Sequence, residues 1–430
     1  MKKQTIRSGA ATASAVVLIA VLAGCGSSSG GSTEDVAETQ GSGAAKAPAN
    51  ARVQLGEAAP IARKFSAEIA AEYGGYDGEL SKSPYADFKA AKGPWKLCYS
   101  ESFQGNPWRV ALTKQMKRIV GRYQKAGLLS DFSMSVSDGD LARENQQIRQ
   151  FADQGCSIIL ALVGSPTGLN AAIKSAHDKG VPVLTLGGTA TSPYAQNVDS
   201  NFRRVGAQMA ANATAGADGG SILMVKGIQG ITAAEQQNEG AKEQWKKDGA
   251  KITAEVYGNW APAPTKQAVL RALATNPAKI PSVWTTGSET PVIAEAFKQG
   301  GRPVPAITGS ISGDALGYWN QNKDTFKFNG YGQLPSWTAE TAVRVAMRML
   351  NGNGPKINTM LVPMPLVTQA DLPGLYESCM TPNSSDVFPV LENDPLPTGQ
   401  MDEYFEEKGE VGPYDYSDIP RACDGAGTAR

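Results

Sequence analysis

Short apolar runs alternate with segments of helical periodicity between residues 95 and 186. In the helix expected at 110–126, Leu112, Met116 and Ile119 recur at a spacing that places them on one face. Continuous apolar strands between amphipathic helices are typical of a parallel sheet covered on both faces. The sequence therefore predicts an α/β unit here. Its strands are expected at 96–100, 132–136, 157–163 and 181–186, and its further helices at 140–154 and 167–179.

The same alternation begins again at Ser221, which indicates a second doubly wound unit. A helix expected at 336–350 and an apolar stretch at 360–367 have no sheet of their own, so we expect them to cross back between the units. We therefore predict an α/β fold of two doubly wound parallel-sheet lobes joined by a three-crossing hinge. The second lobe has its strands expected at 222–225, 252–257, 282–285 and 306–308, and its helices at 232–247, 265–274 and 291–299.

The N-terminus has the pattern of an export signal. Lys2, Lys3 and Arg7 precede an apolar stretch, 15–23, that is too short to span a hydrocarbon core of roughly 30 Å. That stretch ends in Leu22-Ala23-Gly24-Cys25, which resembles the lipobox of bacterial lipoproteins, where the cysteine sulfur carries the lipid. The alternative is an ordinary signal peptide with a chance cysteine. The Gly-, Ser- and Ala-rich stretch that follows favours the lipoprotein, because it has the composition of a flexible tether.

The remaining chain, about 370 residues, exceeds what one hydrophobic core usually serves, which supports two lobes. In open α/β sheets, ligands bind outside the carboxyl ends of the strands, so two such lobes would face one cleft.

The predicted segments are a signal peptide at 1–25, a tether at 26–60, an N-terminal helical extension at 61–93, lobe 1 at 94–200 and about 333–358, lobe 2 at 201–332 and about 359–375, and a C-terminal extension at 376–430.

Charge and cysteine content narrow the class of partner. Lys+Arg and Asp+Glu are equal at 41 each, so the net charge does not indicate nucleic acid, and a small molecule is the expected partner. Export permits disulfides, and four cysteines besides Cys25 allow three pairings. We expect Cys379 to pair with Cys423, because the segment between them is rich in Pro, Asp and Gly and would gain most from a cross-link. Cys98 and Cys156 are either bridged or buried thiols.

Residues 95–362 resemble the type I periplasmic binding proteins of the ribose and simple-sugar branch, which serve ABC importers. The order of predicted elements is similar throughout. The local matches are Tyr99-Ser100, Asn106-Pro107-Trp108, Asp138 to Phe151 ahead of Gly155-Cys156-Ser157-Ile158-Ile159-Leu160, Lys179-Gly180-Val181-Pro182-Val183, Gly227-Ile228-Gln229-Gly230-Ile231-Thr232-Ala233-Ala234, Glu239-Gly240 and Gly332-Gln333-Leu334-Pro335.

The resemblance implies particular ligand contacts. Asn106 would hydrogen-bond ligand hydroxyls, Trp108 would stack on a ring face, and Gln333 would donate and accept at the hinge. These residue types suit sugars, because an indole offers a flat apolar surface and an amide pairs with a hydroxyl as donor and acceptor. Phe103 is a candidate second wall. Trp260 either caps the cleft mouth or packs in the core.

The sequence departs from the family where charged residues usually read hydroxyls. Gly187-Gly188 stand where Asp-Arg is common, and Glu235 stands where an Arg is usual. Thr285-Thr286-Gly287-Ser288 lacks the expected Asn-Asp, and the turn at 309–313 lacks its Asp. The ligand is therefore expected to be a sugar, a polyol, another cyclic compound, or a compound whose basic group pairs with Glu235.

Catalytic motifs are missing from the sequence. His177 is the single histidine, which excludes a multi-histidine metal site, and no nucleophile elbow or phosphate loop occurs. We expect a non-enzymatic, lipid-anchored extracytoplasmic monomer that uses no cofactor or metal and delivers its ligand to a permease. The alternatives are a sensing module that signals to a membrane kinase and a hydrolase of surface glycans.

Overall fold

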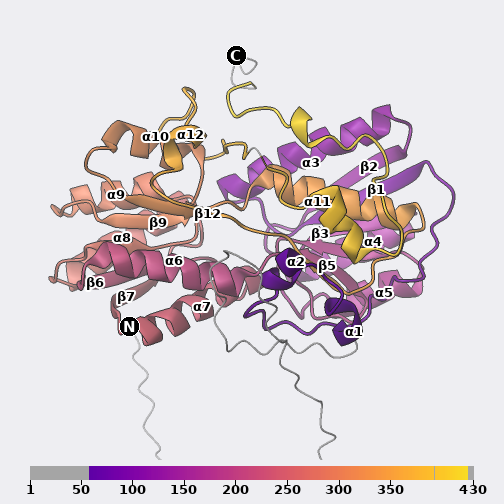
Figure 1. Ribbon diagram of the computed structural model, residues 1–430, viewed down its shortest axis with the longest axis horizontal. Coiled ribbons are helices and arrows are strands. Elements are labelled where there is room, and N and C mark those ends of the chain that lie inside the picture. Colours follow the sequence, from indigo (N-terminus) through magenta and orange to yellow (C-terminus); the bar gives the residue numbers. More distant parts are fainter. Residues whose placement is uncertain (1–57, 392, 425–430) are drawn as a thin grey trace, which may run out of the picture. The chain divides into compact units, whose positions relative to one another are not determined.

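The computed structural model describes residues 58–391 and 393–424 and contains two six-stranded sheets, one in each lobe (Figure 1). The two parallel-sheet lobes predicted from the alternating pattern are confirmed. The expected signal peptide, the lipid-bearing Cys25 and nearly all of the expected tether lie outside the described residues.

Lobe 1 is a fully parallel sheet with the strand order β11-β5-β4-β3-β1-β2. The strands at residues 95–101, 158–162 and 183–186 are almost wholly buried, which is why they read as largely continuous apolar runs rather than alternating ones. The strands are β1 (Trp95–Glu101), β2 (Leu129–Val136), β3 (Ile158–Leu162), β4 (Val183–Leu186), β5 (Ala195–Asp199) and β11 (Thr359–Leu361), and the helices are α3 (Pro107–Lys125), α4 (Leu141–Asp153), α5 (Asn170–Asp178) and α11 (Pro335–Leu350).

Lobe 2 has the strand order β12-β10-β9-β8-β6-β7, with β12 antiparallel at the edge and the other strands parallel. Its strands are β6 (Ser221–Lys226), β7 (Lys251–Tyr257), β8 (Ser282–Trp284), β9 (Ala306–Ser310), β10 (Phe328–Tyr331) and β12 (Leu366–Val367), and its helices are α6 (Phe202–Ala217), α7 (Thr232–Asp248), α8 (Pro262–Thr275), α9 (Thr290–Gln299) and α10 (Gly313–Asn322).

The chain passes between the sheets three times: after β5, between β10 and α11, and between β11 and β12. The third crossing corrects one predicted boundary. Because β11 pairs with β5, residues 359–361 belong to the sheet of lobe 1, whereas the sequence assigned about 359–375 to lobe 2. A strand of three residues contains too little pattern to show which sheet edge receives it.

Sequence patterns missed β5, α6, β10 and α10. The strand β5 is fully buried although it carries Gln196 and Asn197, so it has no apolar run to reveal it. The helix α6 is rich in Ala and Gly and lies very close to α7. A Cβ on Gly206 would stand 2.1 Å from the backbone oxygen of Gln237, and one on Gly240 would stand 2.0 Å from that of Arg203. Small residues here permit close helix packing rather than mark a loop.

The segment before β1 packs on lobe 1. It contains the short helices α1 (Ala59–Ala62) and α2 (Ala67–Glu72). Tyr73, Tyr76 and Leu80 join the buried cluster of lobe 1, and the Tyr73 hydroxyl donates to the Thr359 carbonyl at 2.8 Å. The expected N-terminal helical extension is thus part of the core. After β12 the chain forms α12 (Leu372–Leu375), α13 (Thr398–Met401) and two 3-10 turns, Asp402–Tyr404 and Tyr416–Asp418.

The described part of the chain contains two disulfides. Cys379 is bonded to Cys423, the pairing expected from the sequence, and Cys98 is bonded to Cys156, which the sequence left open. Among residues 58–391 and 393–424, no helix is both long and apolar enough to cross a membrane.

Candidate ligand-binding site

A cavity is lined by residues at or just after the carboxyl ends of strands in both sheets. The position agrees with the general rule for open α/β sheets. Lobe 1 contributes residues after β1, β3 and β4, lobe 2 contributes residues after β6 to β10, and Gln333 comes from the second crossing. The lining residues are Asn106, Pro107, Trp108, Arg109, Leu162, Gly187, Ile231, Ala233, Trp260, Thr286, Gly287, Ser288, Ser310, Tyr331 and Gln333.

Asn106 lines the cavity and is also the N-cap of α3. Its Oδ1 accepts a hydrogen bond from the Arg109 amide at 2.9 Å, which satisfies one of the free N–H groups at the helix start. One lone pair of Oδ1 is therefore used by the helix. The second lone pair and the Nδ2 donor can serve a ligand, which is compatible with the donor-and-acceptor role implied by the resemblance.

Trp108 and Gln333 also line the cavity and are joined to each other. The indole Nε1 of Trp108 donates to the Gln333 carbonyl at 2.7 Å, so the indole presents its ring face rather than its N–H. Gly187 explains how both fit. A Cβ on Gly187 would stand 3.5 Å from the Trp108 ring and 3.8 Å from Gln333 Nε2, and its φ of +61° favours glycine. At the position where the family commonly has an Asp, Gly187 has no side chain and leaves room for the Trp108 indole.

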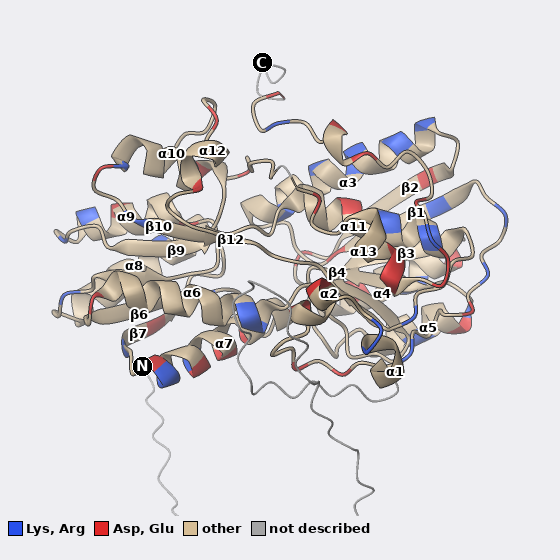
Figure 2. Ribbon diagram, in the orientation of Figure 1, with Lys and Arg blue, Asp and Glu red and all other residues tan. Residues whose placement is uncertain are grey.

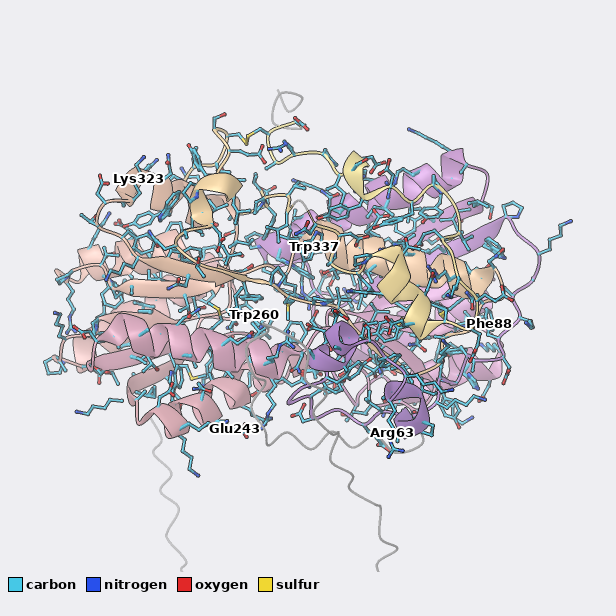
Figure 3. All side chains as sticks on the ribbon, viewed as in Figure 1. Arg63, Phe88, Glu243, Trp260, Lys323 and Trp337 are labelled. Carbon is cyan, nitrogen blue, oxygen red and sulfur yellow. A yellow bond between two sulfur atoms is a disulfide. The ribbon has the colours of Figure 1, made fainter. Side chains whose placement is uncertain are left out.

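Trp260 forms a second aromatic wall, from the loop between β7 and α8 (Figure 3). Its backbone is left-handed, with φ of +50° after +56° at Asn259, a costly conformation that concentrates at functional sites. The ring lies on Gly227, where a Cβ would come within 2.3 Å of it. Its Nε1 donates to Thr286 Oγ1 at 3.2 Å. Trp260 therefore also uses its N–H on the protein. It lines the cavity and packs against an apolar cluster of lobe 2, so the two placements left open by the sequence do not exclude each other.

Arg109, which sequence reasoning overlooked, lines the cavity and forms a buried ion pair with Glu101. Its Nη1 also donates to Ser102 Oγ at 2.8 Å and to the Phe103 carbonyl at 3.1 Å. Burial raises the pKa of Glu101, and the Arg109 charge opposes that shift. The pair ties the end of β1 to the start of α3 and so fixes the wall that carries Asn106 and Trp108.

Lobe 2 supplies an uncharged polar floor. The Tyr331 hydroxyl donates to the Thr286 carbonyl at 2.7 Å, and Thr286 Oγ1 donates to Gln237 at 2.7 Å. Ser310 Oγ is buried and has no hydrogen-bond partner among the described residues. Behind Gly287, the carboxyl of Glu289 is fully buried, and this burial, with Asp314 nearby, raises the pKa of Glu289 to about 8. At neutral pH that group is therefore a neutral acid.

Two predicted contacts do not line the cavity. The Phe103 ring packs over Gly105, where a Cβ would come within 1.8 Å of it. Glu235 closes its own helix start, because its Oε1 accepts from the Gly230 amide at 2.9 Å. Glu235 is thus not a lining residue, and its pairing with a basic ligand group stays a prediction. Thr286, Ser288 and Ser310 had no sequence signal beyond their places after predicted strands.

Residues 99–354 match the model of a family described as a periplasmic binding protein domain. The match covers more than half of the chain. This chain belongs to the periplasmic binding protein family. A search of curated proteins finds no match.

Solved structures of solute-binding proteins share the fold. An ABC transporter solute-binding protein from Thermobispora bispora has a TM-score of 0.61 and 23% identity, covering 69% of this chain and 92% of its own. One from Mycobacterium smegmatis with bound glycerol has a TM-score of 0.60 and 18% identity, covering 70% and 100%. One from Bacillus halodurans with bound myo-inositol has a TM-score of 0.58 and 18% identity, covering 66% and 98%. At these identities the likeness shows the fold alone.

Proposed function

We propose that this protein is the extracytoplasmic substrate-binding component of an ABC importer and that it captures a small uncharged polyhydroxy ring compound, a sugar or a cyclic polyol. The observation that supports it most is the pair of indoles, Trp108 from lobe 1 and Trp260 from lobe 2. Both line one cavity, and both use their N–H on the protein. What remains for a ligand is two flat apolar faces, which suit the C–H faces of a sugar ring.

The polar groups around the indoles favour a neutral ligand. Asn106, Ser288, Ser310 and Thr286 supply uncharged donors and acceptors, and Arg109 is already paired with Glu101. An uncharged compound would leave no buried charge without a partner. D-allose and myo-inositol, which are bound in two solute-binding proteins of similar fold, belong to this compound class, and glycerol, which is bound in a third, is an acyclic polyol.

The surface charge is compatible with a small-molecule partner. Lys and Arg positions and Asp and Glu positions are scattered over both lobes in Figure 2. We further propose that Cys25 carries a lipid anchor, that the protein acts as a monomer without catalysis, and that a permease receives the ligand. Replacement Cys25→Ser should move the protein from the membrane fraction to the medium or the periplasmic extract. Retention in the membrane fraction would contradict the anchor.

A binding panel tests the ligand class. We expect a thermal shift or calorimetric signal with at least one compound among D-allose, L-arabinose, D-ribose, myo-inositol and glycerol. Trp108→Ala and Trp260→Ala should each abolish that signal. Phe103→Ala and Glu235→Gln are matched controls, because both positions are close in sequence to lining residues but do not line the cavity. Binding that survives both tryptophan replacements, or that depends on Glu235, would overturn the proposal, as would a response confined to amines.

A further inference from the structure

The chain after lobe 2 contacts both lobes. We call residues 376–391 and 393–424 the C-terminal segment; Figure 1 shows most of it in yellow, running past α12, α11 and α3. The matched family domain ends at residue 354, so the family model does not cover this segment.

The first part of the C-terminal segment is fixed to lobe 2. The Gly313 amide at the start of α10 donates to the Val387 carbonyl at 2.7 Å. Gly317 on α10 lies against the Thr381 backbone so closely that a Cβ would stand 2.4 Å from it. The side chains of Val387 and Leu391 pack on the apolar cluster of lobe 2. Backbone bonding and apolar burial thus hold the chain here up to residue 391.

The middle part is fixed to lobe 1 through two buried arginines of α11. Arg344 Nη2 contacts Glu410 Oε1 at 2.6 Å, and Arg348 Nη1 contacts Asp402 Oδ1 at 2.7 Å. The arginine side chains are 1% and 0% exposed. Detaching the segment would leave two buried cations without these carboxylates, which is strongly unfavourable. Tyr404 and Phe405 are part of the lobe 1 core and strengthen the same attachment.

The last part returns to lobe 2 and is closed covalently. Asp418 still pairs with Arg122 of α3, at 2.5 Å. Four residues later, the Ala422 amide donates to a carboxylate oxygen of Glu377 at 3.1 Å, and Cys423 is bonded to Cys379. The segment therefore forms a covalent ring that leaves lobe 2, attaches to lobe 1 and returns.

Two stretches of the ring pass between the lobes, and we call them its legs. Both are short. From Leu391 on lobe 2 to Asp394, which contacts Arg344 on lobe 1, there are three residue steps, which span roughly 10 Å at full extension. From Asp418 to Ala422 there are four steps, or roughly 14 Å. Each leg sets an upper limit on the distance between its two attachments for as long as both hold. Separation of the lobes at this face is thus limited by chain length.

We propose that the C-terminal segment is a brace that restricts the relative motion of the two lobes, so that the ligand-free protein samples a narrow range of interlobe distances. Hinge rotation in two-lobed proteins is ordinarily absorbed by a few residues at the crossings. Here a fourth connection, the ring, stands beside the three crossings. This inference concerns the fold and does not depend on which compound binds.

The test measures interlobe distances without ligand. Labels are placed at Lys125→Cys on α3 and Lys298→Cys on α9, both exposed, in the full chain with Cys25→Ala. Pulsed electron paramagnetic resonance measures the distribution of distances between the two labels. It is compared between this protein and a slackened variant, in which the ring is opened and lengthened. The slackened variant carries Cys379→Ser, Cys423→Ser and ten Gly/Ser residues inserted after Asn393. The matched control has the same insertion after Gly301, in an exposed turn of lobe 2, with the ring intact.

We expect one narrow distance distribution for the parent and the control, and a distribution at least twice as wide for the slackened variant. Equal widths in a slackened variant that unfolds cooperatively would overturn the brace. The parent alone gives a second criterion that does not depend on the variant folding. A broad or two-population distribution in the parent would also overturn the proposal.

Discussion

The indole Nε1 of Trp108 donates a 2.7 Å hydrogen bond to the backbone carbonyl of Gln333. Trp108 begins the first helix of lobe 1, and Gln333 lies at the crossing between β10 and α11. The bond therefore connects a wall of the ligand cavity directly to the hinge. It orients the ring, and it links the position of that ring to the geometry of the crossing.

Trp108→Phe separates these two effects. The variant keeps an aromatic face but loses the N–H, so we expect ligand affinity to fall about fivefold, in line with the roughly 1 kcal/mol net value of one hydrogen bond. Trp108→Ala removes the face as well and should cost more. Calorimetry with the compound selected by the binding panel measures both. Equal losses in the two variants would show that the hydrogen bond, not the ring face, dominates.

Gly187 should not tolerate the Asp that the family commonly has there. Its φ is +61°, and a Cβ would stand 3.1 Å from Leu162 and 3.5 Å from the Trp108 ring. We expect Gly187→Asp to destabilise the fold by about 1–3 kcal/mol and to displace the indole, lowering ligand affinity. Gly188→Ala is the matched control, because its Cβ would meet only Val163 at 3.9 Å. Chemical denaturation and calorimetry compare the two variants.

The strands of the two lobes show how much of the fold could be predicted from the sequence. Periodicity was sufficient for the two lobes, because strands buried on both faces must be apolar. It failed for β5, where Gln196 and Asn197 are buried by hydrogen bonds rather than by apolar contact. Asn197 Oδ1 accepts from Thr185 at 2.7 Å, and Gln196 Nε2 donates to the Ile357 carbonyl at 3.0 Å.

The candidate site was only partly predictable. Asn106, Trp108 and Gln333, which the family resemblance named, line the cavity, and each lies after the end of a strand. Glu235 also follows a strand, yet its side chain turns back to its own loop. Which way a side chain points after a turn depends on local hydrogen bonds that no spacing rule contains. The same limit applies to Arg109, whose role depends on the buried carboxylate of Glu101.

The pair of Arg109 and Glu101 allows a test of the buried charge. Arg109→Met leaves Glu101 buried without its cation, and we expect a loss of about 3 kcal/mol in unfolding free energy at neutral pH. Adding Glu101→Gln should recover part of that loss, because it removes the buried charge and keeps a side-chain oxygen that can accept from the Tyr99 hydroxyl. Chemical denaturation of the single and double variants measures the difference. A double variant as unstable as Arg109→Met would show that the pair acts through packing alone.

Stability should fall as the pH rises from about 4 to about 8. Burial raises the pKa of Glu289 to about 8, and burial raises the pKa of Asp314 and of Asp199 to about 7. A raised carboxyl pKa means that the folded chain binds more protons than the unfolded chain between the two pKa values. The stabilising contribution is complete below the unfolded pKa and is lost as the pH passes the folded pKa, at up to roughly 1.4 kcal/mol per pH unit for each group.

Glu289→Gln removes the contribution of Glu289 to that decline. The amide has the shape of the neutral acid and does not titrate, so the variant should match the parent below about pH 4 and lose less stability than the parent between about pH 4.5 and pH 8. Glu68→Gln, at an exposed position of α2, is the control and should follow the parent curve. Denaturant unfolding at a series of pH values measures all three. A parent curve that is flat or rises up to pH 8 would mean that Glu289 is ionised or solvated in the folded protein, and the neutral floor beneath Gly287 would then have to be abandoned.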